Sequence, residues 1–139
     1  MFKITIKADD ILDDVYKKLD INKPTMQIIG QVVESDILLN FRDGKDPSGK
    51  KWTPLKPNTV RKKLKKSGVV KMLQDTGNLK KSLNYKAYKN KVKIGYGAKY
   101  SIYHQMGTKY MPIRKILPTN ITEIDIDRIN EVLREYFKN

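Results

Sequence analysis

Residues 82–96 constrain the fold of this chain more than any other stretch, because apolar and polar side chains alternate there with the period of a half-buried β-strand. The alternation breaks at residues 89–90, where a lysine and an asparagine favour a bend. Two antiparallel strands, 82–88 and 91–96, are therefore predicted. The same alternation over residues 2–6 predicts a further short strand with one buried face.

Apolar side chains recur at helical spacing on both sides of these strands. One amphipathic helix is predicted over about residues 9–19, a second over about 24–40 and a third from about residue 125 onward. Helices that bracket a small sheet bury their apolar faces against it. The predicted fold class is therefore α+β, with N-terminal and C-terminal amphipathic helices packed on a small, mainly antiparallel β-sheet.

The length of 139 residues suits a single domain over residues 1–139 and is too short for two ordinary ones. Residues 42–58 contain three of the six prolines and two glycines, so a long irregular loop is predicted there. A short basic helix is predicted over residues 60–66. Another short helix is predicted over residues 100–106, ended by Gly107.

The sequence contains few of the residues that catalysis or metal binding would need. It has no cysteine and a single histidine, His104, so thiolate ligands, disulfides and multi-histidine metal sites within one chain are excluded. The acids within residues 42–99 are only Asp43, Asp46 and Asp75, too few for a nuclease centre beside the basic stretch. We therefore expect no enzymatic activity, no cofactor and no metal, and a structural role for His104.

No segment is suited to a membrane or to secretion. The N-terminus alternates polar and apolar residues and lacks the apolar region of a signal peptide. No stretch approaches the roughly 20 mostly apolar residues that span a bilayer. We therefore expect no secretion signal and no membrane partner.

The net charge of +14 is concentrated in the middle of the chain. Residues 42–99 hold 18 Lys and Arg against 3 Asp and Glu, a net charge of +15. Such a block attracts nucleic acid or an acidic protein face, or is a solvated surface that keeps the protein in solution. The basic run at residues 61–66 has no aromatic side chain within it, so phosphate or acidic-surface contact is expected there rather than base stacking. A small basic nucleic-acid-binding protein is therefore an alternative function.

A contact surface for partner proteins or nucleic acid is predicted from this basic run and from the segment that follows the 100–106 helix. Tyr, Met and Arg are enriched in the cores of protein interfaces, and five such residues lie between positions 103 and 114. The predicted contact residues are Arg61, Lys62, Lys63, Lys65, Lys66, Tyr103, Met106, Tyr110, Met111 and Arg114.

The apolar members of otherwise polar stretches are predicted to form a buried framework. Burial is the commonest use of a large apolar side chain and stabilises a fold by roughly 1.5–3 kcal/mol for each one. The single tryptophan, Trp52, is either an anchor that holds the loop on the core or an interface hot spot, and the first is the commoner use. The predicted framework residues are Trp52, Leu55, Leu79, Ile102 and Leu117.

Several short motifs follow one another in a fixed order between Phe41 and Leu117. They are Asp46-Pro-Ser-Gly-Lys-Lys-Trp-Thr-Pro-Leu55, Thr59 before the basic run, Leu73-Gln-Asp-Thr-Gly-Asn-Leu-Lys-Lys-Ser-Leu83, Val92-Lys-Ile-Gly95, Tyr100-Ser-Ile-Tyr-His-Gln-Met-Gly107 and Met111-Pro-Ile-Arg-Lys-Ile-Leu117. In this order and spacing the chain resembles the phage virion morphogenesis family, the tail-completion proteins of Mu-like and related tailed phages and prophages. Ser101 stands where that family commonly has Ala, and Ile116 where Phe is usual.

The resemblance assigns a structural role to one set of residues. They are Pro47, Gly49, Trp52, Leu55, Thr59, Leu73, Thr76, Gly77, Leu79, Ser82, Gly95, Tyr100, His104, Gln105, Gly107, Pro112 and Leu117. It implies a non-enzymatic structural protein, encoded by a phage or prophage, that acts in tail completion or head–tail joining. The implied partners are other phage tail or neck proteins, and a homo-oligomeric ring and a DNA contact stay open. The implied location is the host bacterial cytoplasm during assembly and then the tail or neck of the virion.

Overall fold

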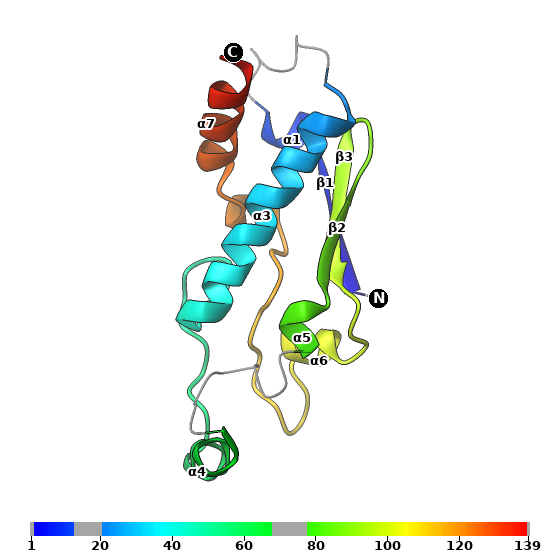
Figure 1. Cartoon of the computed structure of the whole chain (residues 1–139). Helices are drawn as coiled ribbons and strands as arrows, with labels where there is room; N and C mark the ends of the chain where they lie inside the picture. Colours follow the sequence, from blue (N-terminus) through cyan, green and yellow to red (C-terminus); the bar gives the residue numbers. More distant parts are fainter. Residues whose placement is uncertain (1, 13–20, 68–77, 139) are drawn as a thin grey trace.

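The computed structural model describes residues 2–12, 21–67 and 78–138, and Figure 1 shows their arrangement. The elements in chain order are β1 (Phe2–Lys7), α1 (Ala8–Ile11), α3 (Lys23–Asp43), α4 (Pro57–Ser67), α5 (Asn78–Lys81), β2 (Leu83–Ala87), β3 (Lys91–Tyr96), α6 (Ser101–Met106), the 3₁₀-helix η1 (Ile121–Glu123) and α7 (Ile126–Phe137).

The three strands form one antiparallel sheet in the order β1-β3-β2, so β3 is the central strand. Ile94 in the middle of β3 pairs with Ile4 of β1 on one side and with Tyr85 of β2 on the other. Val92, Ile94 and Tyr96 are completely buried, as the period-two pattern requires for one face of a half-buried strand. The predicted antiparallel sheet is confirmed.

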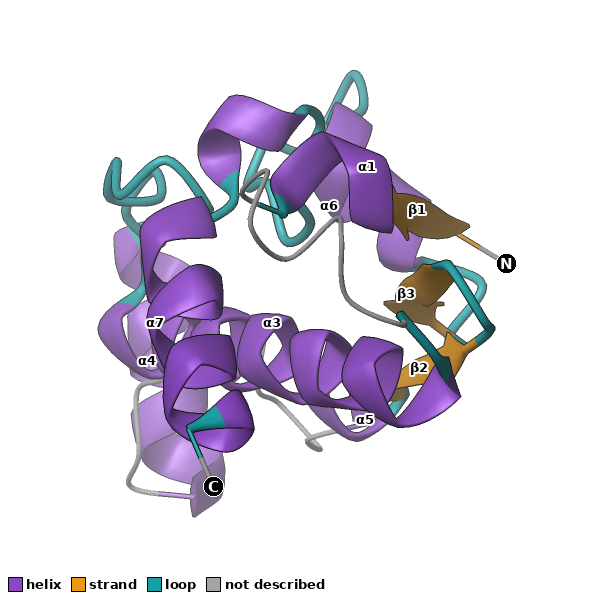
Figure 2. Cartoon of the chain, turned by 90° about the horizontal axis from the view of Figure 1, so that it is seen from above, coloured by secondary structure: helices purple, strands orange, loops and turns teal. Residues whose placement is uncertain are grey.

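Helix α3 is the longest element of the described residues and packs against β2 and β3 of the sheet (Figure 2). It begins after Asn22, whose side chain accepts a hydrogen bond from the Thr25 backbone at 3.2 Å, and it ends at Gly44 with a φ of 66°. Gly30 lies where the helix meets the sheet: a Cβ built there would be 2.5 Å from the Tyr85 ring. The glycine therefore allows the close approach of helix and strand.

The fold is α+β, as predicted, but the packing of the terminal helices on the sheet is not confirmed. Helix α7 packs against α3, which lies between α7 and the sheet in Figure 1. The buried Asn130 of α7 donates a hydrogen bond to the Ile11 carbonyl oxygen at 2.9 Å and so links the end of the chain to its beginning. Residues 13–20, most of the predicted first helix, lie outside the described part of the chain.

The predicted loop over 42–58 is shorter and more regular than expected. Helix α3 continues to Asp43 and α4 begins at Pro57. Between them, the Asp46 carboxylate accepts hydrogen bonds from the backbone of Ser48 at 2.9 Å and of Lys50 at 3.0 Å. These bonds close a tight turn, because an aspartate side chain readily bonds the backbone a few residues on.

Candidate interaction site

Residues 114–117 belong to neither a helix nor a strand; they run through the middle of the molecule (Figure 1) and are named the strap. Its backbone is hydrogen-bonded by side chains that come from three other parts of the chain: the loop after α3, strand β3 and helix α6. Buried backbone groups outside helices and sheets need such partners, since leaving them unpaired is costly. The strap is thus held by side chains rather than by a neighbouring strand.

Gln105 of α6 makes three of these bonds and is itself buried. Its Oε1 accepts from the backbone N–H groups of Ile116 at 2.8 Å and Leu117 at 3.0 Å. Its Nε2 donates to the Leu117 carbonyl oxygen at 2.9 Å. One amide side chain therefore satisfies three buried backbone groups, which explains a glutamine at this place in the sequence.

Trp52 and Tyr96 hold the other side of the strap. The Trp52 indole donates from Nε1 to the Lys115 carbonyl oxygen at 2.8 Å and packs edge-on against the Phe41 ring at 5.4 Å. The Tyr96 hydroxyl donates to the Ile116 carbonyl oxygen at 3.1 Å, and burial raises the pKa of Tyr96, so the hydroxyl stays protonated as a donor. These contacts favour the first of the two interpretations of Trp52, an anchor of the loop on the core.

Arg114, predicted as a contact residue, points inward instead. It is only 8% exposed, its Nε donates to the Thr53 carbonyl oxygen at 3.0 Å, and its Nη2 donates to that of Pro54 at 3.3 Å. Its backbone N–H donates to the His104 carbonyl oxygen at 2.8 Å. The assignment of Arg114 to the contact surface is therefore wrong: this side chain joins the loop to the strap.

The predicted framework is mostly but not wholly buried. Trp52, Leu79 and Leu117 are buried and Leu55 is half-buried. Ile102 is 36% exposed, so its predicted burial is wrong. Only the side of α6 that carries Ser101 and Gln105, one helical turn apart, faces the interior.

Two motif glycines have a steric reason. A Cβ at Gly95 would lie 2.3 Å from the Phe2 carbonyl oxygen, so only glycine lets β1 pair closely there. Gly107 ends α6 with a φ of 73°. Of the other motif residues, Leu73, Thr76 and Gly77 lie outside the described residues, Pro47, Thr59, Ser82 and Pro112 are half-buried, and Gly49 and Tyr100 are exposed.

His104 lies between the strap and the surface. Burial lowers its pKa from the ordinary value of 6.5, and the nearby Arg114 guanidinium lowers it further. Its Nδ1 has no hydrogen-bond partner among the described residues, and neither has the buried Ser101 hydroxyl. The imidazole is therefore neutral at pH 7, and its structural role stays a prediction.

Acidification from about pH 7.5 to 5.5 should lower the melting temperature through His104. The folded chain holds a proton on this imidazole less tightly than the unfolded chain does, because its folded pKa is lowered. Stability is therefore lost as the pH falls through the unfolded pKa of about 6.5. His104→Gln should show a smaller drop in thermal denaturation over the same range. An equal drop in both proteins would contradict this assignment.

The remaining predicted contact residues lie in the half of the molecule away from the C-terminus. Helices α4 and α6 both lie in this half (Figure 1), on different sides of it (Figure 2), and residues 107–113 follow α6 directly. We name α4, α6 and residues 107–113 the contact end. Its exposed cations on α4 are Arg61, Lys62, Lys65 and Lys66, with Lys63 half-buried.

Large apolar side chains are exposed at this contact end. Tyr103 is 54%, Met106 66% and Tyr110 82% exposed, and Met111 is half-buried. Tyr100, Ile102 and Ile113 add to them, so most of the large apolar side chains between residues 100 and 113 reach solvent. Contiguous exposed apolar side chains with a polar rim mark interaction sites.

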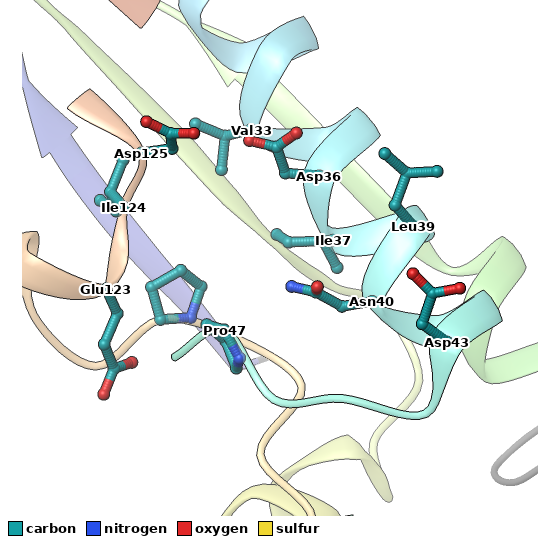
Figure 3. Close-up of a pocket in the computed structure, with 11 residues that line it drawn as sticks. Val33, Asp36, Ile37, Leu39, Asn40, Asp43, Pro47, Glu123, Ile124 and Asp125 are labelled. Atoms are coloured by element: carbon teal, nitrogen blue, oxygen red, sulfur yellow. The ribbon is translucent and has the colours of Figure 1, made fainter. Parts of the chain in front are cut away.

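A groove of about 310 Å³ lies between α3 and residues 118–125 (Figure 3). Four carboxylates line it, and each already has a partner in the fold. Asp36 pairs with Arg128, Asp43 with Arg42, Glu123 with Lys115 at 3.6 Å, and Asp125 accepts from the Arg128 backbone at 3.1 Å. Among the described residues, no group of three or more His, Cys, Asp or Glu is placed to hold a metal ion. The four carboxylates of the groove therefore already have structural partners within the fold.

Within the described ranges, no helix combines the length and the apolar character that crossing a bilayer would require.

Fold and site together define a small α+β protein in which side chains clamp a strap and the contact end exposes apolar and basic side chains. The chain matches the model of the phage virion morphogenesis family over residues 5–138 and belongs to that family. The resemblance drawn from its motifs is confirmed, and the protein is a phage structural protein of virion morphogenesis. Neither the curated proteins nor the solved structures include a significant match.

Proposed function

We propose that this protein completes the phage tail or joins head to tail, and that it does so by protein–protein contacts made with the contact end. The observation that carries the proposal is the exposure of Tyr103, Met106 and Tyr110 on and beside helix α6, which is hydrogen-bonded to the strap through Gln105. Tyr and Met are enriched in interface cores. A helix that is already held in place loses less conformational entropy on binding.

The basic helix α4 adds charge to the same end. A positive patch speeds the encounter with an acidic partner and orients the collision. The net charge of +14 also makes copies of the free protein repel each other at low salt. A homo-oligomeric ring would therefore form on an acidic neighbour in the growing particle, in the host bacterial cytoplasm, and remain in the tail or neck of the virion.

Substitution of the exposed apolar residues tests this proposal. In a phage that depends on a plasmid copy of the gene, Tyr103→Ser with Met106→Ser should lower the yield of infectious particles at least about tenfold, because interface hot spots contribute about 2 kcal/mol or more each. The melting temperature should hardly change, since exposed side chains contribute little to folding.

The matched control is Leu39→Ser with Tyr136→Ser, which removes two exposed apolar side chains from α3 and α7. Its particle yield should stay near that of the wild type. Equal yields from the two double variants would contradict a docking role for the contact end.

A further inference from the structure

The outer face of the sheet carries a grid of lysines. Because side chains alternate along a strand, the residues opposite the α3-covered face follow from the pairing register. In rows across β2, β3 and β1 they are Tyr88, Lys91 and Lys7, then Lys86, Lys93 and Thr5, then Asn84, Gly95 and Lys3. Five of these nine positions are lysine and none is acidic. Lys3, Lys7 and Lys86 are exposed and Lys91 and Lys93 are half-buried, so the face is open to solvent.

Two pairs of lysines on this face stand directly opposite each other. Lys7 pairs with Lys91, and Lys86 pairs with Lys93. Like charges in directly opposed positions destabilise a sheet. Lysines on edge strands serve to prevent sheets from joining, which accounts for those of β1 and β2. It does not account for Lys91 and Lys93 in the central strand.

Three of the lysines also converge on one aromatic ring. The ammonium groups of Lys86, Lys91 and Lys93 lie 5.6, 5.3 and 5.6 Å from the centroid of the Tyr88 ring. The ring attracts each cation and so holds three positive charges close together at one end of the face. This arrangement suits a multiply charged anion.

The composition of the face distinguishes between two classes of polyanion. Lysine is depleted from protein–protein interfaces, and Tyr88 is the one large apolar side chain among the nine positions. Lysine binds phosphate well as a point charge, and backbone phosphates supply most of the affinity in sequence-independent nucleic-acid binding. Both observations favour nucleic acid over an acidic protein.

We propose that the outer face of the sheet binds the phosphate backbone of nucleic acid, through Lys3, Lys7, Lys86, Lys91 and Lys93. The site is separate from the basic helix α4 and from the apolar contact end. It rests on the sheet alone, so its failure would leave the proposed docking function standing.

The test measures binding of the full-length protein to a mixed-sequence DNA duplex by fluorescence anisotropy at several salt concentrations. The sheet variant combines Lys86→Gln, Lys91→Gln and Lys93→Gln, which keep a polar, slightly shorter side chain at each position and remove three charges. We expect its affinity at low salt to fall at least about tenfold. The slope of log affinity against log salt should lessen by about 2 to 3, since each phosphate contact contributes about 0.9.

The control variant combines Lys23→Gln, Lys50→Gln and Lys51→Gln, which remove the same charge at three exposed lysines outside the sheet and the contact end. Its affinity for the duplex should lie within about threefold of that of the wild type. The small loss expected comes from the lower net charge alone. The sheet variant should melt close to the wild type at low salt, because relief of both opposed lysine pairs offsets the loss of the three lysine contacts with the Tyr88 ring. This result would show that its weaker binding does not come from unfolding.

Three results would overturn the proposal. One is equal loss of binding in the two variants, which would indicate general charge. Another is no salt-dependent binding of the wild-type protein to the duplex. The third is tighter binding to polyglutamate than to DNA with the same dependence on the three lysines, which would assign the face to an acidic protein.

Discussion

Gln105→Ala should destabilise the protein by about 3–5 kcal/mol, since it leaves three buried backbone groups of the strap without partners, at about 1–3 kcal/mol each. The groups are the N–H of Ile116 and both the N–H and the carbonyl of Leu117. A loss of this size is a large fraction of the stability of a small domain. Urea denaturation followed by circular dichroism would measure it.

Two variants separate hydrogen bonding from packing. Gln105→Met keeps nearly the same volume and loses all three hydrogen bonds, so we expect a loss close to that of the alanine variant. Met106→Ala, at the neighbouring position that is 66% exposed, should change stability by less than about 0.5 kcal/mol. A stable Gln105→Met protein would contradict the role of the amide as the clamp of the strap.

Trp52→Ala should lower the free energy of unfolding by about 3–5 kcal/mol, the usual loss for a buried large aromatic side chain. It removes both the edge-on contact with Phe41 and the hydrogen bond to the Lys115 carbonyl oxygen. Trp52→Phe keeps part of the packing and loses the hydrogen bond, so we expect about 1–3 kcal/mol for it. The melting temperatures of both variants would measure these losses.

The control is Tyr110→Ala, which removes an aromatic side chain that is 82% exposed. Its melting temperature should equal that of the wild type. If Trp52→Ala melted normally and yet failed to support particle assembly, Trp52 would be an interface residue rather than a loop anchor.

The strands and the long helix follow from local patterns in the sequence. Alternation over β3 reflects one buried face, and Asn22 before Pro24 marks the start of α3. Arg114 could not be placed in this way, because its partners are backbone carbonyls about 60 residues earlier in the chain. Residue type shows that an arginine can donate several hydrogen bonds, but only the fold shows in which direction it points.

For two features of the surface, the sequence contains signals that a search for apolar patterns does not detect. In α6 the small and polar pair Ser101 and Gln105, four residues apart, faces inward, so Ile102 is left on the exposed side. On the sheet, the polar phase of the alternation contains Lys86, Lys91 and Lys93, but only the strand register places Lys86 opposite Lys93 and Lys7 opposite Lys91. Local sequence patterns therefore predict the helices and strands, but not which side chains of separate segments lie together.

Photo-crosslinking within purified particles tests the central claim most directly, namely that the contact end docks on other virion proteins. A photoreactive amino acid would replace Tyr103, 54% exposed on α6, or Tyr136, 52% exposed near the C-terminus at the opposite end (Figure 1). The account predicts crosslinks to other tail or neck proteins from position 103 and few from position 136. Crosslinks from position 136 with none from position 103 would contradict it.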